Sequence, residues 1–135
     1  MTSPSEELGL HSHFGPLEYA IMEACWSGPT MDVGECARRL PGEQAYTTVK
    51  TVMERLVKKG YLKRERRGKA YVYWPSETRS EVQDRVARRR SDELLAGFGP
   101  LAVSNFLKSV GSDTDRLNQL KSLLAEIEEA ESREA

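Results

Sequence analysis

Cysteine is scarce in this sequence of 135 residues: only Cys25 and Cys36 are present, and their spacing forms no CxxC motif. Because disulfides are rare in cytosolic proteins and each cysteine falls inside a predicted helix, we expect two buried, reduced thiols. A redox pair between them is the less favoured alternative. No apolar run approaches the ~18 residues of a membrane span, and the N-terminus lacks the charged and then apolar pattern of a secretion signal. These absences predict a cytoplasmic protein without membrane insertion.

Motifs of catalysis and of cofactor binding are also missing. The chain has no Gly-rich phosphate loop, no Ser-His-Asp or Cys-His set on predicted elements, and no convincing pair of carboxylates. His11 and His13 form a His-x-His pair, but no complete set of metal ligands accompanies them. We therefore expect no enzyme activity, no metal site and no cofactor.

The charges are unevenly distributed, although the net charge is only −1. Residues 31–74 contain eleven Lys or Arg against five Asp or Glu, whereas residues 113–135 contain three against seven. A basic middle and an acidic end indicate that the two parts meet different partners, with nucleic acid favoured for the basic part.

The chain is organised around a helix predicted over residues 45–59. An apolar stripe at helical spacing, formed by Ala45, Val49, Val52, Met53 and Leu56, predicts the buried side. Short hydroxyls and long cations on the other side suit a DNA major groove, where they can meet phosphates and base edges. The predicted DNA-binding residues of this helix are Tyr46, Thr47, Thr48, Lys50, Thr51 and Arg55. A solvated amphipathic helix is the alternative.

Two shorter helices are predicted before this one, and residues 1–13 are predicted to be a flexible tail because they show little periodicity. Pro16 suits the first turn of a helix that closes near Trp26. Asp32, with Glu35 three residues later, has the spacing of a capping box for a helix to about Leu40. Short links between three helices indicate a helix-turn-helix core.

A β-hairpin is predicted directly after the central helix. Gly60 suits the helix end, and two β-rich segments within 61–75 flank a turn at Arg67-Gly68-Lys69. The tip carries three cations, Arg66, Arg67 and Lys69, which we expect to contact DNA phosphates. A hairpin with a merely soluble tip is the alternative. The prediction for residues 14–75 is thus a winged-helix DNA-binding domain.

Residues 76–135 are predicted to be a helical dimerisation region. Helices are expected to about Phe98, over about 101–110, and from Ser112 with Asp115 onward. The last has apolar residues at three-four-three spacing, which requires a partner helix. About fifty residues are few for a separate core, so a core shared by two copies is favoured over packing on the first domain. The dimerisation residues are Val103, Phe106, Leu107, Leu117, Leu120, Leu124 and Ile127. The fold class is mainly α with a small β-hairpin.

The most distinctive segments are Leu17-Glu-Tyr-Ala-Ile-Met22 with Trp26, Ala45-Tyr-Thr-Thr-Val-Lys-Thr-Val, Arg55-Leu56 and Lys58-Lys59-Gly60-Tyr61-Leu62. With the hairpin and the helical C-terminal half, they resemble the penicillinase-repressor family, which includes the β-lactamase and methicillin-resistance repressors and copper-responsive relatives. The resemblance covers nearly the whole chain from residue 15, and it implies a homodimeric repressor on a pseudo-palindromic DNA operator. It also implies that Thr47, Lys50, Thr51 and Arg55 face DNA.

The resemblance bears on regulation too. Asn105-Phe106 is similar to the bond that a sensor-linked membrane metalloprotease cuts in the β-lactamase repressors, and cutting there would remove the dimerisation helices. The alternative is that Phe106 is a core residue and Asn105 its surface neighbour. Copper-responsive members end in a cysteine-rich motif, whereas no cysteine follows Cys36 here.

The alternative to a DNA-binding repressor is a winged-helix module that binds protein without specific DNA binding.

Overall fold

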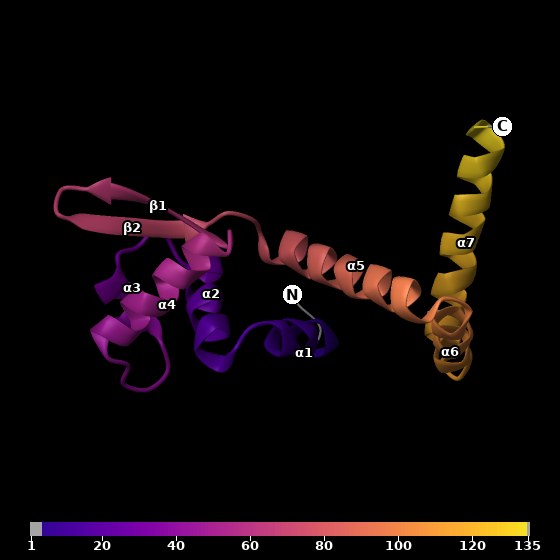
Figure 1. Ribbon diagram of the computed structural model, residues 1–135, viewed down its shortest axis with the longest axis horizontal. Helices are drawn as coiled ribbons and strands as arrows, with labels where there is room; N and C mark the ends of the chain where they lie inside the picture. Colours follow the sequence, from indigo (N-terminus) through magenta and orange to yellow (C-terminus); the bar gives the residue numbers. More distant parts are fainter. Residues whose placement is uncertain (1–3, 135) are drawn as a thin grey trace. The chain divides into compact units, whose positions relative to one another are not determined.

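A computed structural model describes residues 4–134, with side chains described from Gly9 onward. The fold is mainly helical with one antiparallel hairpin, as predicted (Figure 1). The chain divides into two compact units, the first ending at Arg88 and the second starting at Arg89. In order, the described elements are α1 (Pro4–His13), α2 (Pro16–Ser27), α3 (Val33–Arg39), α4 (Tyr46–Lys58), β1 (Leu62–Arg67), β2 (Ala70–Pro75), α5 (Arg79–Phe98), α6 (Pro100–Gly111) and α7 (Thr114–Glu134).

The prediction of a flexible tail over residues 1–13 is wrong for residues 4–13, which form α1; residues 1–3 lie outside the described part. The helix lacks an amphipathic stripe, so its sequence carries no periodic signal. Tertiary burial holds it instead, because Leu10 is 1% exposed and the following Phe14 is 4% exposed in the core. The first unit therefore includes this segment.

Both histidines consequently lie on a helix. The His11 ring stacks on Tyr19 with centroids 3.7 Å apart. His13 Nε2 lies 2.6 Å from the Tyr61 hydroxyl and makes a hydrogen bond with it. Among the described side chains, no group of three or more His, Cys, Asp or Glu residues is placed to hold a metal ion.

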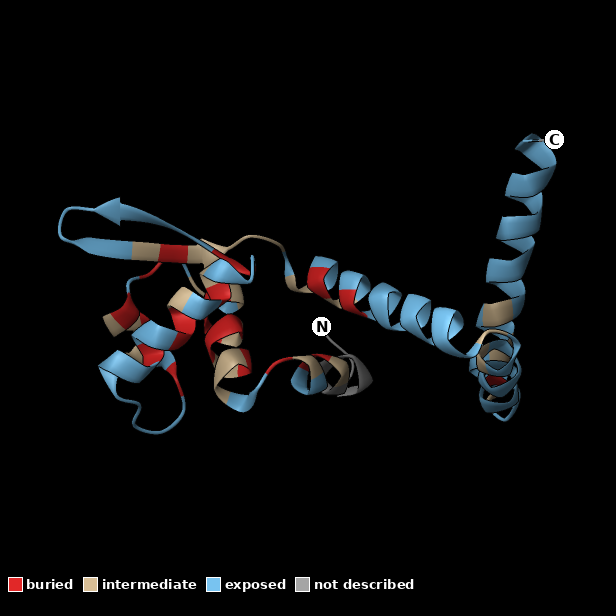
Figure 2. Ribbon diagram, viewed as in Figure 1, coloured by how far each residue is buried: buried red, intermediate tan, exposed pale blue. Residues whose placement is uncertain are grey.

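The core of the first unit lies between α2, α3, α4 and β2, where the red segments gather in Figure 2. Pro16 occupies the first turn of α2, as predicted. Asp32 caps α3, because its Oδ1 accepts the Glu35 N–H at 2.8 Å. Proline and the cap thus set the starts of the two helices that support α4.

The hairpin is joined to this core by a backbone bridge that the sequence did not indicate. Met31 and Tyr73 exchange both backbone hydrogen bonds, at 3.1 and 2.8 Å, so the extended link before α3 pairs with β2. Both side chains are 1% exposed. The root of the hairpin is therefore held on the helices by backbone and side-chain contacts together.

Helix α5 begins inside the first unit, so this unit extends beyond the predicted boundary at residue 75. Thr78 and Glu81 form a reciprocal capping box at its start. Val82 is 1% exposed and Val86 7% exposed, and both belong to the core of the first unit. Burial of these two valines explains why the first unit ends at Arg88.

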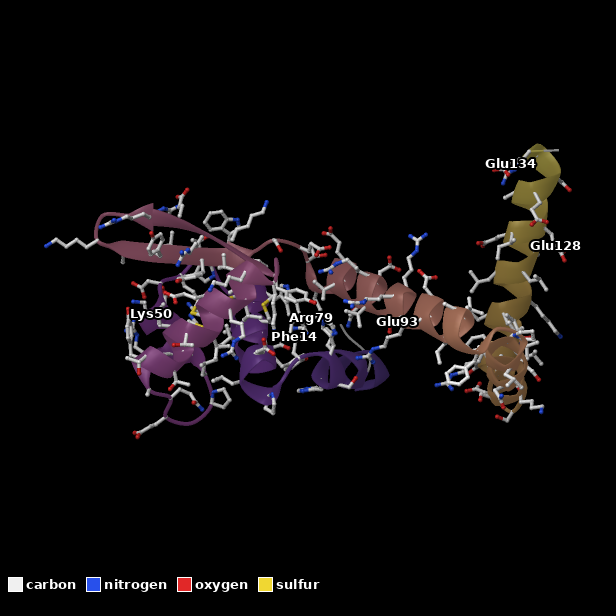
Figure 3. The ribbon with its side chains drawn as sticks, in the orientation of Figure 1. Phe14, Lys50, Arg79, Glu93, Glu128 and Glu134 are labelled. Atoms are coloured by element: carbon white, nitrogen blue, oxygen red, sulfur yellow. The ribbon has the colours of Figure 1, made fainter. Side chains whose placement is uncertain are left out.

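Polar and cation–π contacts also hold the start of α5. The guanidinium of Arg79, labelled in Figure 3, donates to the Glu23 carboxylate and lies 5.2 Å from the centroid of the Trp26 ring. The Trp26 indole N–H donates to the Glu77 carbonyl at 3.1 Å. The first turn of α5 is thereby tied to α2.

In the second unit, the cap of α7 differs from the prediction. Asp113, rather than Ser112, caps the helix: its Oδ1 accepts the N–H groups of Asp115 at 3.0 Å and Arg116 at 3.2 Å. The negative charge of this carboxylate also interacts favourably with the positive, N-terminal end of the helix dipole. No described helix is long and apolar enough to cross a membrane.

Cys25 and Cys36 are free thiols, buried as predicted, at 2% and 0% exposure. They come from α2 and α3. Hydrogen bonding to Cys36, together with burial, raises the pKa of Cys25. The Cys25 thiol is therefore protonated and packs as a small apolar group.

Candidate nucleic-acid interface

Helix α4 turns one side to the core and the other to solvent. Val49, Met53 and Leu56 are 0% exposed, whereas Tyr46 is 56% exposed. All six residues predicted to bind DNA from this helix are exposed: Tyr46, Thr47, Thr48, Lys50, Thr51 and Arg55. Figure 3 labels Lys50 on this helix. The six side chains form one surface, which we call the recognition face, and contact with DNA stays a prediction for each of them.

Ala45 does not belong to the buried stripe, contrary to the prediction. It is exposed and stands at the N-cap of α4 with an extended backbone, φ −66° and ψ 135°. The helical spacing fails there because the chain has not yet entered the helix. Val49, one turn later, is the first buried residue of α4.

The C-terminal end of α4 is closed by a Schellman motif. Gly60 has φ 88°, a left-handed conformation that glycine adopts without cost, and its N–H donates to the Val57 carbonyl at 3.0 Å. The Tyr61 N–H donates to the Leu56 carbonyl at 2.9 Å. This motif turns the chain directly into β1, so the hairpin follows the recognition face without a flexible linker.

An ion pair joins this end of α4 to α2. Lys59 Nζ lies 3.0 Å from Glu18 Oε2. Burial alone would raise the pKa of the Glu18 carboxyl, but the hydrogen bond from Lys59 and nearby cations lower it below its ordinary value. The pair thus helps to fix α4 against α2 at neutral pH.

The hairpin has the register of a two-residue turn, with Arg67 opposite Ala70. Gly68, at φ 64°, supplies the left-handed residue that the turn needs. The three predicted phosphate-binding residues, Arg66, Arg67 and Lys69, are all exposed at this tip. Arg67 Nε pairs with Glu65 at 2.9 Å, on the surface, where such a pair contributes little. These cations therefore remain accessible to phosphate.

One contact between α4 and the hairpin was not predicted. Arg64 Nη1 on β1 lies 3.9 Å from Glu54 Oε1 on α4. The Arg64 guanidinium also lies over the Tyr71 ring, 4.3 Å from its centroid. The pairing register of the hairpin places Arg64 opposite Tyr73, but no sequence signal relates Arg64 to Glu54 on α4.

The second unit has almost no core of its own, as the pale blue of α6 and α7 in Figure 2 shows. Across residues 89–134, Val110 is the only buried residue. Of the predicted dimerisation residues, Leu117 and Leu120 are half-buried and the other five are exposed. The exposed large apolar side chains of this unit are Leu94, Leu95, Phe98, Leu101, Val103, Phe106, Leu107, Leu123, Leu124 and Ile127. We call these residues the apolar surface; patches of this kind mark interaction sites.

Asn105 and Phe106 lie within α6, and both are exposed. Phe106, at 61% exposure, is not a core residue of the single chain, although it lines a groove of ≈ 390 Å³ with Leu120 and Leu123. The Asn105 amide donates to the Leu101 carbonyl at 2.9 Å. A protease acting there would first have to open this helix locally, since its site is a helical peptide bond.

A helix-turn-helix core with an exposed basic recognition face and a cationic hairpin tip defines a winged-helix DNA-binding protein. The family model described as penicillinase repressor matches residues 14–126. The chain belongs to the penicillinase-repressor family, and it is a DNA-binding transcriptional repressor.

Two named relatives in sequence agree with this membership. The transcriptional regulator BlaI of Mycobacterium tuberculosis is 35% identical over 127 residues, which cover 87% of this chain and 86% of that protein. The penicillinase repressor of Bacillus licheniformis is 24% identical over 111 residues, which cover 81% and 87%. Among solved structures, the transcriptional regulator Tm0710 from Thermotoga maritima is 24% identical, with a TM-score of 0.48 over 97% of this chain and 87% of that chain.

Proposed function

We propose that the protein acts in the cytoplasm as a homodimer that represses transcription by binding a pseudo-palindromic operator. The observation that carries the proposal is the recognition face of α4, which is exposed along its length and followed at once by the cationic tip of the hairpin. An α-helix of this kind fits the major groove, while a hairpin tip suits the flanking phosphates.

The apolar surface of the second unit supports the dimer. Its large side chains include Phe98, Leu101 and Phe106, which are 62%, 64% and 61% exposed in the single chain. Burial of such side chains against a second copy is favourable by about 25 cal/mol per Å². Two copies related by a twofold axis would present two recognition faces, so half-site centres should lie about 10 base pairs, or a multiple of this, apart.

Selection of bound sequences from random DNA, followed by affinity measurements over a range of salt, tests the proposed function. Specific operator binding through several phosphates should weaken steeply as salt rises. Absence of any preferred sequence, combined with weak salt dependence, would favour the alternative of a protein-interaction module.

Lys50→Ala is expected to lower operator affinity by about 1 to 3 kcal/mol and to flatten the base preference at one position of each half-site. The reason is that Lys50 is exposed on the recognition face, where a lysine can reach guanine acceptors. Arg55→Ala should behave similarly. Fluorescence anisotropy with operators changed one base pair at a time measures both effects, and unchanged affinity and preference in Lys50→Ala would contradict the assignment.

Arg67→Ala is expected to weaken binding to all DNA sequences alike. Because Arg67 lies at the hairpin tip and would contact phosphate, its loss should reduce the slope of log affinity against log salt by about 1. Titrations at several salt concentrations give this slope. Arg89→Ala, which removes an exposed arginine outside the first unit, is the matched control and should leave the slope unchanged.

Regulated cleavage at Asn105-Phe106 by a sensor-linked protease stays a proposal from the family resemblance. The exposure of both residues supports it. Removal of the chain beyond this bond would take away α7 and part of α6, and with them five of the ten residues of the apolar surface. Repression would then be lost through the loss of bivalent binding.

A further inference from the structure

One carboxylate, that of Glu54, lies on the same side of α4 as the recognition face. Glu54 follows Thr47 by about two turns of α4 and Lys50 by about one turn, so it shares their side of the helix. Its side chain is 41% exposed, whereas the adjacent Met53 is fully buried. If α4 enters the major groove with the side that carries Thr47 and Lys50, it brings this carboxylate to the base edges as well.

A carboxylate so close to DNA phosphates is repelled unless a cation accompanies it. Arg64 supplies that cation, since its Nη1 lies 3.9 Å from Glu54 Oε1. Arg64 is itself held by stacking over Tyr71, and an arginine side chain stays protonated in proteins. The guanidinium is therefore charged and positioned from the hairpin.

The pair leaves an acceptor available. Glu54 Oε1 faces Arg64, and no hydrogen bond within the described part of the chain occupies the second carboxylate oxygen. In the major groove, a carboxylate accepts a hydrogen bond from the N4 amino group of cytosine. Guanine presents two acceptors and thymine one acceptor there, both of which repel a carboxylate, and adenine places an acceptor beside its amino group.

We propose that Glu54 is a specificity-determining residue, whose carboxylate selects cytosine at one position of each half-site, and that Arg64 is the residue that positions it. This inference rests on the proposed function and names a base preference for that same interface. The competing interpretation is a structural tie, in which Glu54 and Arg64 only hold α4 against the hairpin. A tie affects all DNA sequences equally, whereas a base contact affects one position.

The test is in vitro selection of half-site sequences with the full-length protein and with Glu54→Ala and Glu54→Gln. In Glu54→Ala, preference for cytosine at one position should fall by about 5-fold to 150-fold, while affinity for unrelated DNA rises because a negative charge is lost. In Glu54→Gln the preference at that position should move to adenine, because glutamine pairs with adenine N6 and N7. Arg64→Gln should weaken the cytosine preference at the same position.

Glu65→Gln is the matched control, because Glu65 is an exposed carboxylate of the hairpin that pairs with Arg67 instead. It should leave every base preference unchanged. Thermal unfolding followed by circular dichroism verifies that each variant is folded. Uniform weakening across all sequences, or intact preferences in both Glu54 variants, would overturn the inference. If the unaltered protein selects no sequence at all, the proposed function itself fails, which separates the two results.

Discussion

Leu124→Asp is expected to convert the proposed dimer to a monomer and to lower operator affinity by about 10²-fold to 10⁴-fold, the gain that linking two binding modules typically provides. Leu124 is 51% exposed in the single chain, so an aspartate there is hydrated in the monomer and leaves its fold intact. At a dimer interface the same aspartate would be buried without a partner charge, which is costly. Sedimentation velocity gives the mass, and anisotropy with operator DNA gives the affinity.

The control for this variant is Lys121→Asp on the same helix. Lys121 is an exposed polar residue outside the apolar surface, so the Lys121→Asp protein should remain dimeric. Leu120→Asp should also give monomers, although Leu120 of α7 is half-buried in the groove beside α6 and its replacement will destabilise the second unit as well. A dimer retained by Leu124→Asp at micromolar concentration would refute the proposed interface.

Leu56→Ala is expected to lower the free energy of unfolding by about 2 to 5 kcal/mol, the usual cost of a cavity in a packed core. Leu56 is 0% exposed, and its carbonyl also accepts the Tyr61 N–H that closes α4. Because a domain is stable by only about 5 to 15 kcal/mol, this loss is a large fraction of the total stability. Urea titration followed by circular dichroism measures it.

Val57→Ala is the comparison for the core variant. Val57 is adjacent, only partly buried, and loses less apolar volume, so its cost should be clearly smaller. A Leu56→Ala variant whose stability lies within ~0.5 kcal/mol of the unaltered protein would contradict the described position of α4, since that range is typical of surface changes.

Features that depend on local pattern were predictable. The stripe from Val49 to Leu56 has helical period, and Gly60 and Gly68 stand at positions where the backbone is left-handed. Such signals involve residues within one or two turns, so the helix, its end and the hairpin follow from sequence. Exposure of the predicted recognition and tip residues follows from the same pattern.

Features that depend on distant contacts were not predictable. Nothing near Leu10 and Phe14 indicates a helix, because their burial depends on residues distant in the sequence, such as Tyr61. The pairing of Glu54 with Arg64 requires the angle between α4 and the hairpin, which no periodicity contains. The capping residue of α7 was misassigned because Ser112 and Asp113 are neighbours and only the geometry distinguishes them.

The position of Val82 and Val86 has a practical consequence for anyone excising the DNA-binding part of this chain. A fragment that stops after β2, where the hairpin ends, would discard two valines that complete the apolar interior, along with the arginine that stacks on Trp26. Such a fragment should aggregate or melt early, whereas one that continues through Arg88 retains its full complement of interior side chains.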